Sequence, residues 1–197
     1  MKFFFGAVCC LSMIVGCDSD PTLTSPKFNP EEAAAKAIEA YDSDSDGQIS
    51  KAESRKCALD PKAGWDANND GNIDETEIAD RLTTYEAMKP GLRTNASCTV
   101  LFKNRPLVGA EVVYEPEEFM GGAVCSASGT TDEEGIASII ADELEDPTIP
   151  GIHTGLYRVR ITHPDKDLAA KFNSETELFV ELSPLDMMTK SPVFKLN

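Results

Sequence analysis

The sequence is poor in histidine, tryptophan and positive charge. Among 197 residues there are two histidines, His153 and His163, one tryptophan, and 18 lysines and arginines against 34 aspartates and glutamates, for a formal net charge of −16. Nucleic-acid binding depends mainly on cations that neutralise phosphates, so this acid excess excludes a nucleic-acid partner. There is no H-x-x-x-H or C-x-x-C motif and no serine or cysteine nucleophile motif. We therefore expect no catalytic residues and a protein that is not an enzyme.

Long apolar runs are absent beyond the N-terminus. Residues 3–15 form an apolar stretch behind Lys2 that is too short to cross a bilayer comfortably and is typical of a secretory signal. The stretch ends in Ile14–Cys17 (IVGC), which resembles the lipobox of bacterial lipoproteins. The resemblance implies lipidation of Cys17 and a mature protein anchored to a membrane of the cell envelope. An ordinary cleaved signal or an uncleaved hydrophobic start is the alternative interpretation.

A metal-ligand pattern occurs twice, offset by 24 residues: Tyr41–Glu53 (YDSDSDGQISKAE) and Trp65–Glu77 (WDANNDGNIDETE). Both copies fit the EF-hand calcium loop, in which oxygens from alternate residues and a closing glutamate surround a hard cation. The expected ligands of the first Ca²⁺ are Asp42, Asp44, Asp46, Gln48 through its backbone carbonyl, Ser50 and Glu53. Those of the second Ca²⁺ are Asp66, Asn68, Asp70, Asn72 through its backbone carbonyl, Asp74 and Glu77.

The sequence around the loops predicts two helices. Asn29 and Pro30 are typical of the start of one helix, and Asp74 with Glu77 forms a capping box at the start of the other. The segment 54–64 between the loops contains a proline, so two full central helices cannot fit. The pair resembles the compact calcium modules of bacterial secreted and surface proteins, with a spacing shorter than that of dockerins.

Two further patterns predict how the calcium module packs. Ile49 and Ile73 hold the same position in the two loops, and we expect them to pair in a short ribbon. In the second helix, one face is expected to carry Ile78, Leu82 and Tyr85. The two loops should therefore behave as one unit.

From residue 92 onward, short alternating runs stand between turn residues. The expected strands are residues 99–102, 110–115, 136–141, 156–162, 178–182 and 193–196. The run 156–162 is the clearest, because Tyr157, Val159 and Ile161 share one face and Arg158 and Arg160 the other. Six or seven short strands predict an antiparallel β-sandwich.

Three segments resemble the carboxypeptidase regulatory-like, transthyretin-like family: residues 104–112 (NRPLVGAEV), 129–135 (GTTDEEG) and 155–159 (GLYRV). The resemblance implies a prealbumin-like or immunoglobulin-like sandwich. It does not imply an activity. The chain departs from the family at an insertion-like stretch, 117–128, and at an acidic loop, 142–147. Loops of this kind on a rigid sandwich are where a partner binds.

Cysteine use fits an oxidising compartment. Removal of the leader and lipidation of Cys17 would leave Cys57, Cys98 and Cys125, which cannot all pair within one chain. Cys98 and Cys125 both belong to the expected sandwich and are the candidate disulfide. Cys57 is expected to be buried on a short central helix or free.

The expected organisation is a multidomain α+β chain. Its parts are a signal peptide with lipobox (1–17), a tether rich in Asp, Ser, Thr and Pro (18–28), an all-α EF-hand pair (29–91) and the β-sandwich (92–197). We expect two Ca²⁺ ions to act as structural cofactors in an exported, lipid-anchored, non-enzymatic bacterial lipoprotein whose sandwich serves adhesion or assembly. The alternative is a calcium-dependent module that binds a glycan or an envelope protein, and a periplasmic enzyme ranks third.

Overall fold

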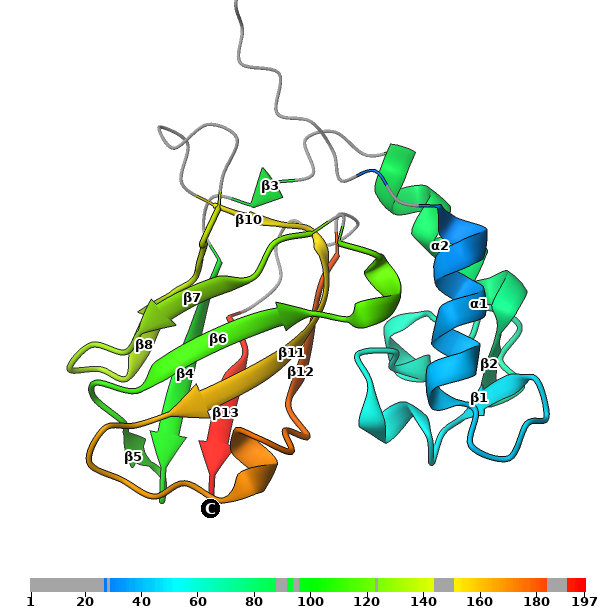
Figure 1. The fold of residues 1–197 in the computed structure, drawn as a ribbon. Helices are drawn as coiled ribbons and strands as arrows, with labels where there is room; N and C mark the ends of the chain where they lie inside the picture. Colours follow the sequence, from blue (N-terminus) through cyan, green and yellow to red (C-terminus); the bar gives the residue numbers. More distant parts are fainter. Residues whose placement is uncertain are drawn as a thin grey trace, which may run out of the picture.

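The computed structural model describes residues 27, 29–87, 92–93, 96–122, 124–143, 151–183 and 191–197. The signal peptide, Cys17 and nearly all of the tether lie outside these residues. Figure 1 shows an α+β fold, with a helical unit (residues 29–87) beside a sheet unit (the described residues from 92 onward). Within the described ranges, no helix combines the length and the apolarity that crossing a membrane requires.

The first helix, α1 (Pro30–Tyr41), begins where the sequence predicts. The Oδ1 atom of Asn29 accepts hydrogen bonds from the backbone N–H groups of Glu31 and Glu32, each at 3.1 Å. Pro30 holds the first helical position, where its missing N–H is not needed. The predicted start of this helix is thus confirmed.

The second helix, α2 (Glu75–Ala87), packs against α1. Its capping box is formed, because the N–H of Glu77 donates to Oδ1 of Asp74 at 2.9 Å and the N–H of Asp74 donates to Oε2 of Glu77 at 3.0 Å. The predicted apolar face is confirmed as well, with side chains no more than 2% exposed: Ile78, Leu82 and Tyr85.

A two-stranded ribbon joins the loops of the helical unit. Strands β1 (Gln48–Ser50) and β2 (Asn72–Asp74) pair antiparallel, with Ile49 opposite Ile73 as predicted and both side chains fully buried. The segment between the loops holds only two single 3-10 turns, η1 (Ser54–Lys56) and η2 (Pro61–Ala63). The prediction that two full central helices cannot fit is confirmed.

The larger sheet of the sheet unit has five antiparallel strands in the order β12-β11-β6-β7-β9. Their bounds are β6 (Glu111–Pro116), β7 (Ala127–Thr130), β9 (Ile140–Ala141), β11 (Gly155–Thr162) and β12 (Phe179–Leu182). The predicted alternation in β11 is confirmed, because Tyr157, Val159 and Ile161 are fully buried while Arg158 and Arg160 lie on the other face.

The smaller sheet is built on β4 and has the order β13-β4-β5, with β8 also paired to β4. Its strands are β4 (Ser97–Phe102), β5 (Arg105–Pro106), β8 (Ile136–Ser138) and β13 (Val193–Leu196). The expectation of a wholly antiparallel arrangement is wrong, because β13 runs parallel to β4. The strand before β13 lies in the other sheet, so no tight turn forces β13 to run antiparallel to its neighbour.

The two sheets contribute side chains to one apolar core. The hydroxyl group of Tyr114, on β6, lies beside the thiol of Cys98, on β4, and burial together with this neighbour raises the pKa of Tyr114. Buried residues of β11 and β13 belong to the same core. The remaining short elements are β3 (Leu92–Arg93), which pairs with β10 (Ile152–His153), and the turns η3 (Glu118–Met120) and η4 (Ala170–Phe172).

The expected strand 136–141 is divided between the two sheets, as β8 and β9. The chain changes sheets at Ile139, whose N–H donates to the carbonyl of Ala96 at 2.9 Å. At this point the backbone passes close to β7, since a Cβ atom added to Gly129 would lie 2.1 Å from the carbonyl oxygen of Ser138. Glycine at 129 therefore allows the two sheets to approach.

Substitution of Gly129 should test this approach. We expect Gly129→Ala to lower the free energy of unfolding by about 1–3 kcal/mol, because backbone must move to accept the methyl group. In the control Gly155→Ala, the added atom meets side chains at 3.4–3.5 Å, so stability should be unchanged or up to about 1 kcal/mol higher. Urea unfolding measures both values, and equal stabilities for the two variants would contradict the prediction.

Candidate metal centre

The first loop gathers three of its expected ligands. The carboxylates of Asp42, Asp44 and Asp46 each offer an oxygen within 4.8 Å of the others. Asp42 is oriented by the loop backbone, because its Oδ1 accepts the N–H of Ser45 at 2.6 Å and its Oδ2 accepts the N–H of Gly47 at 2.8 Å. Gly47 has a φ of 85°, a left-handed conformation that favours glycine at the turn.

The second loop repeats this network. The N–H of Gly71 donates to Oδ2 of Asp66 at 2.9 Å, as Gly47 does to Asp42. The N–H of Asn72 donates to Oδ1 of Asp70, and the equivalent bond in the first loop runs from Gln48 to Asp46; each measures 2.9 Å. The 24-residue repeat of the sequence is therefore also a repeat of hydrogen bonds.

The closing glutamate of the first loop lies over the start of that loop. Oε2 of Glu53 accepts the N–H and the hydroxyl of Ser50 at 2.9 and 2.8 Å, and Oε1 accepts the N–H of Ser43 at 2.6 Å. The backbone N–H of Ser50 and then that of Ser43 lower the pKa of Glu53 to about 2. This carboxylate is charged at neutral pH and aimed into the loop.

The closing glutamate of the second loop has equivalent bonds. Oε1 of Glu77 accepts the N–H groups of Ala67 and Asn68 at 2.9 and 3.0 Å. Oε2 accepts the N–H of Asp74 at 3.0 Å. Each loop thus positions both oxygens of a terminal carboxylate, which is the arrangement that a bidentate ligand requires.

All twelve expected ligands lie in the two loops, and the ribbon β1–β2 joins the loops with their eighth residues, Ile49 and Ile73, opposite each other. Beside this pair, at the seventh positions, the side chain of Asn72 donates from Nδ2 to Oε1 of Gln48 at 2.8 Å. The side chains at these positions therefore bind each other, which suits the expectation that the backbone carbonyls are the ligands. Asn68 lies at the third position of the second loop, and its Oδ1 accepts the N–H of Asp70 at 2.8 Å.

The loops concentrate negative charge. Repulsion from Asp46, followed by loss of solvation and repulsion from Glu53, raises the pKa of Asp44. Across the described part of the chain, none of the eight ligand carboxylates forms a salt bridge with a lysine or arginine. Clustered oxygen ligands without a protein cation suit a hard divalent ion such as Ca²⁺.

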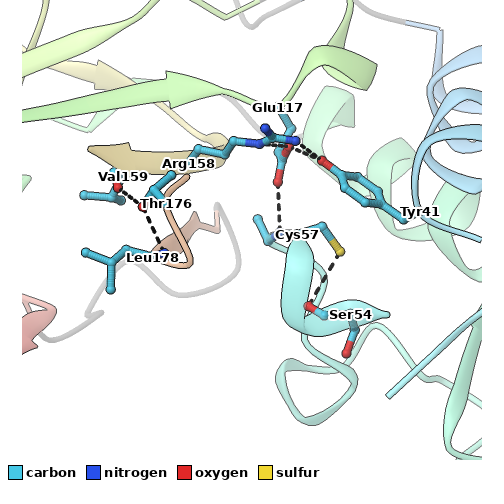
Figure 2. Close-up of polar contacts among 9 residues, drawn as sticks. Tyr41, Ser54, Cys57, Glu117, Arg158, Val159, Thr176 and Leu178 are labelled. Atoms are coloured by element: carbon cyan, nitrogen blue, oxygen red, sulfur yellow. Dashed lines mark hydrogen bonds and ion pairs between the residues drawn. The ribbon is translucent and has the colours of Figure 1, made fainter. Parts of the chain in front are cut away.

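Glu117, a residue that the sequence did not single out, connects the first loop to the sheet unit. Its side chain is fully buried. Oε2 accepts the hydroxyl of Tyr41 at 2.6 Å and Nε of Arg158 at 3.2 Å, and Oε1 accepts the N–H of Ala58 at 3.0 Å (Figure 2). Arg158 also donates to the hydroxyl oxygen of Tyr41 at 2.6 Å. Tyr41 directly precedes the first loop, so the carboxylate fixes the point where that loop begins.

Glu181 binds the residue before the second loop, as Glu117 does for the first. Its Oε2 accepts Nε1 of Trp65, the residue directly before that loop, at 3.0 Å. Its Oε1 accepts Nη2 of Arg81 at 2.7 Å and the hydroxyl of Tyr85. The guanidinium of Arg81 also lies 4.8 Å from the ring centre of Trp65. The sequence signal for these contacts is the polar aromatic residue that precedes each loop.

The cysteines do not form the expected disulfide, since Cys57, Cys98 and Cys125 are all free thiols. Cys98 points into the core from β4 beside Tyr114, whereas Cys125 lies in the segment between η3 and β7 and influences Tyr157. Cys98 thus belongs to a strand of the smaller sheet and Cys125 to the segment before β7, and the expected Cys98–Cys125 disulfide is absent from this structure. Burial raises the pKa of Cys57 to about 12 and that of Cys98 to about 11.

Alkylation should distinguish these thiols. At pH 8 we expect iodoacetamide to modify Cys125, which is half-buried, about tenfold faster or more than Cys57 and Cys98, because only thiolates react. Mass spectrometry of the digested protein gives the rate for each cysteine, and urea-unfolded protein, in which all three react, is the control. A Cys98–Cys125 cross-linked peptide in a non-reduced digest would contradict the prediction.

Comparisons with protein-family models, characterised proteins and solved structures find no match to this chain. Two features of the molecule bear on its function: the repeated geometry of the loops, and the two glutamates, Glu117 and Glu181, that bind the residues before each loop.

Proposed function

We propose that the protein binds two Ca²⁺ ions in EF-hand loops, Asp42–Glu53 and Asp66–Glu77, and that the ions stiffen the helical unit against a β-sandwich formed by the sheet unit. The observation that carries this proposal is the recurrence of one hydrogen-bond network in both loops. That network orients Asp42 and Asp46 in the first loop and Asp66 and Asp70 in the second. In the first loop, oxygens of Asp42, Asp44 and Asp46 lie within 4.8 Å of one another. The protein is a lipid-anchored, non-enzymatic module of the cell envelope, attached through Cys17.

The choice of calcium follows from the ligand chemistry. All expected donors are oxygens, and Ca²⁺ takes 6–8 oxygen ligands at flexible geometry, including a bidentate glutamate. Repulsion within the first loop, expressed in the raised pKa of Asp44, would be relieved by a bound divalent cation. Zinc would prefer nitrogen and sulfur, which these loops do not offer.

A structural role for the ions is supported by the contacts just outside the loops. Tyr41 and Trp65 each precede a loop and each donate to a glutamate of the sheet unit. An ion that orders a loop also restrains the aromatic residue directly before it, and so favours the contact between the units. Extracellular calcium modules bind at about 10⁻⁴–10⁻³ M, where occupancy stabilises a fold rather than signals.

The sandwich in this proposal is supported by the core that the two sheets share. Its resemblance to transthyretin-like modules implies a fold and not an activity. A rigid scaffold with a calcium-stiffened neighbour suits adhesion or assembly at a cell surface. Calcium would supply charge neutralisation and coordination, and the protein's own residues would supply the junction between the units.

Calorimetric titration with calcium tests the ligand assignment. We expect two sites in the wild-type protein and one in each of Glu53→Gln and Glu77→Gln, because each change removes the bidentate ligand of one loop. The matched control is Glu75→Gln, an exposed residue in the same turn as Glu77 that is not a ligand, and it should keep two sites. Absence of calcium binding in the wild-type protein would refute the proposal.

The junction makes a separate prediction. Glu117→Gln should lower the free energy of unfolding by about 1–3 kcal/mol in calcium buffer, because it weakens charge-assisted bonds to a buried acceptor. Glu115→Gln is the matched control, since it removes a half-exposed pair with Arg160 and should cost at most about 1 kcal/mol. Urea unfolding compares the two, and an equal loss in both variants would mean that Glu117 does not stabilise the junction.

A further inference from the structure

A groove lies between the helical unit and the sheet unit. Its main part has a volume of about 750 Å³. One side is bounded by the segment 51–63 and by Asp66, Asn69 and Gly71 of the second loop, and the other by Glu177 and residues of β12. A second hollow, of about 730 Å³, shares Arg55 and Glu177 with the first and continues the groove past Thr176. Figure 1 shows β12, in orange, on the side of the larger sheet that faces the helical unit. We call the two hollows together the interunit groove.

One wall of the interunit groove is the open edge of the larger sheet. β12 ends the strand order, with β11 as its neighbour on one side. The N–H of Val159 donates to the carbonyl of Leu178, and the N–H of Glu117 donates to the carbonyl of Leu156. With the observed register, these bonds leave the backbone N–H and C=O groups of Phe179 and Glu181 pointing away from β11.

These backbone groups are available to another strand. In the described part of the chain, the N–H and C=O groups of Phe179 and Glu181 have no backbone partner outside the sheet. Both residues line the groove. An edge of this kind can be extended by an added strand, which gains main-chain hydrogen bonds along its length.

The opposite wall carries positive charge. Lys51, Arg55 and Lys62 line the main hollow and Lys56 lines its continuation, all four being exposed. Among the described residues, none of them forms a salt bridge. The chain as a whole has a net charge of −16, so a row of four cations without a salt bridge differs from its general acidic character.

The acidic side chains of the groove form no salt bridge with this row in the ranges that the structure describes. Glu181 is already bound by Trp65 and Arg81. Asp60 caps η2 by accepting the N–H of Lys62 at 3.0 Å. Glu175 and Glu177 belong to the segment leading into β12, on the opposite wall. The wall on the helical unit therefore carries four cations against two carboxylates, Asp60 and Asp66, and the other acidic residues of the groove lie on the wall of β12.

We propose that the interunit groove binds an extended acidic segment of a partner protein, which pairs with β12 as an added strand. Side chains of a strand alternate between two faces, so every second residue of the segment faces the helical unit. Acidic residues at those positions meet Lys51, Arg55 and Lys62. The main-chain pairing supplies affinity and the cations supply specificity. The open edge of β12 and the four cations contain no expected calcium ligand, although Asp66 of the second loop also lines the groove.

Fluorescence anisotropy with synthetic peptides tests the proposal on the full chain in mild detergent and calcium buffer. The probe is a labelled octapeptide of alternating threonine and glutamate with capped ends. We expect it to bind, and a threonine–lysine peptide to bind about tenfold or more weakly because its charges meet cations. The glutamate peptide with every backbone nitrogen methylated should lose affinity to a similar extent, since it keeps the charge but cannot donate to β12.

Protein variants complete the test. Arg55→Glu and Lys62→Glu, each at an exposed position, should each weaken binding of the glutamate peptide by about tenfold or more. Lys166→Glu, an exposed residue outside the groove, should leave binding unchanged. No binding, or equal binding of the methylated and unmethylated peptides, would overturn the proposal. A dimer that Arg55→Glu dissociates would overturn it too, by assigning the groove to a second copy of the chain.

Discussion

The fully buried carboxylate of Glu117 joins the two units, and much of the molecule's geometry depends on it. A buried charge without partners costs several kcal/mol, so Glu117 requires the Tyr41 hydroxyl, the Ala58 N–H and Arg158 to stay in place. Tyr41 lies immediately before the first loop, and Ala58 follows it by a single turn. The conformation of that loop and the junction between the units therefore constrain each other.

Opposing electrostatic effects meet inside the first loop. Backbone N–H groups stabilise the charged form of Glu53, whereas crowding by Asp46 opposes the charged form of Asp44. The loop backbone thus holds ligand carboxylates together although they repel one another. A bound cation would remove the repulsion and leave the backbone bonds intact. Ion binding would then favour the loop conformation that also positions Tyr41 for Glu117.

Local patterns were sufficient to predict the helix starts, the Ile49–Ile73 pair and the alternation of β11, because each depends on neighbours in sequence or on a short repeat. Contacts between distant residues were not predictable in this way. Ala58 and Trp65 bind glutamates that follow them by 59 and 116 residues, and no spacing rule connects such pairs. The parallel β13, the division of 136–141 and the free thiols of Cys98 and Cys125 likewise depend on how the two sheets meet.

The junction and the interunit groove have a common origin. Glu181 extends its side chain to Trp65 and Arg81, while its backbone lies on the open edge of β12. An edge strand is normally covered or protected by charge, and here the facing wall is close enough to form a groove yet does not pair with the strand. Because Glu181 both binds the helical unit and offers backbone groups to a ligand, any change that loosens its side-chain contacts should also alter the groove. The second loop lines the same groove through Asp66, Asn69 and Gly71, so order in that loop would shape the binding surface directly as well as through Trp65.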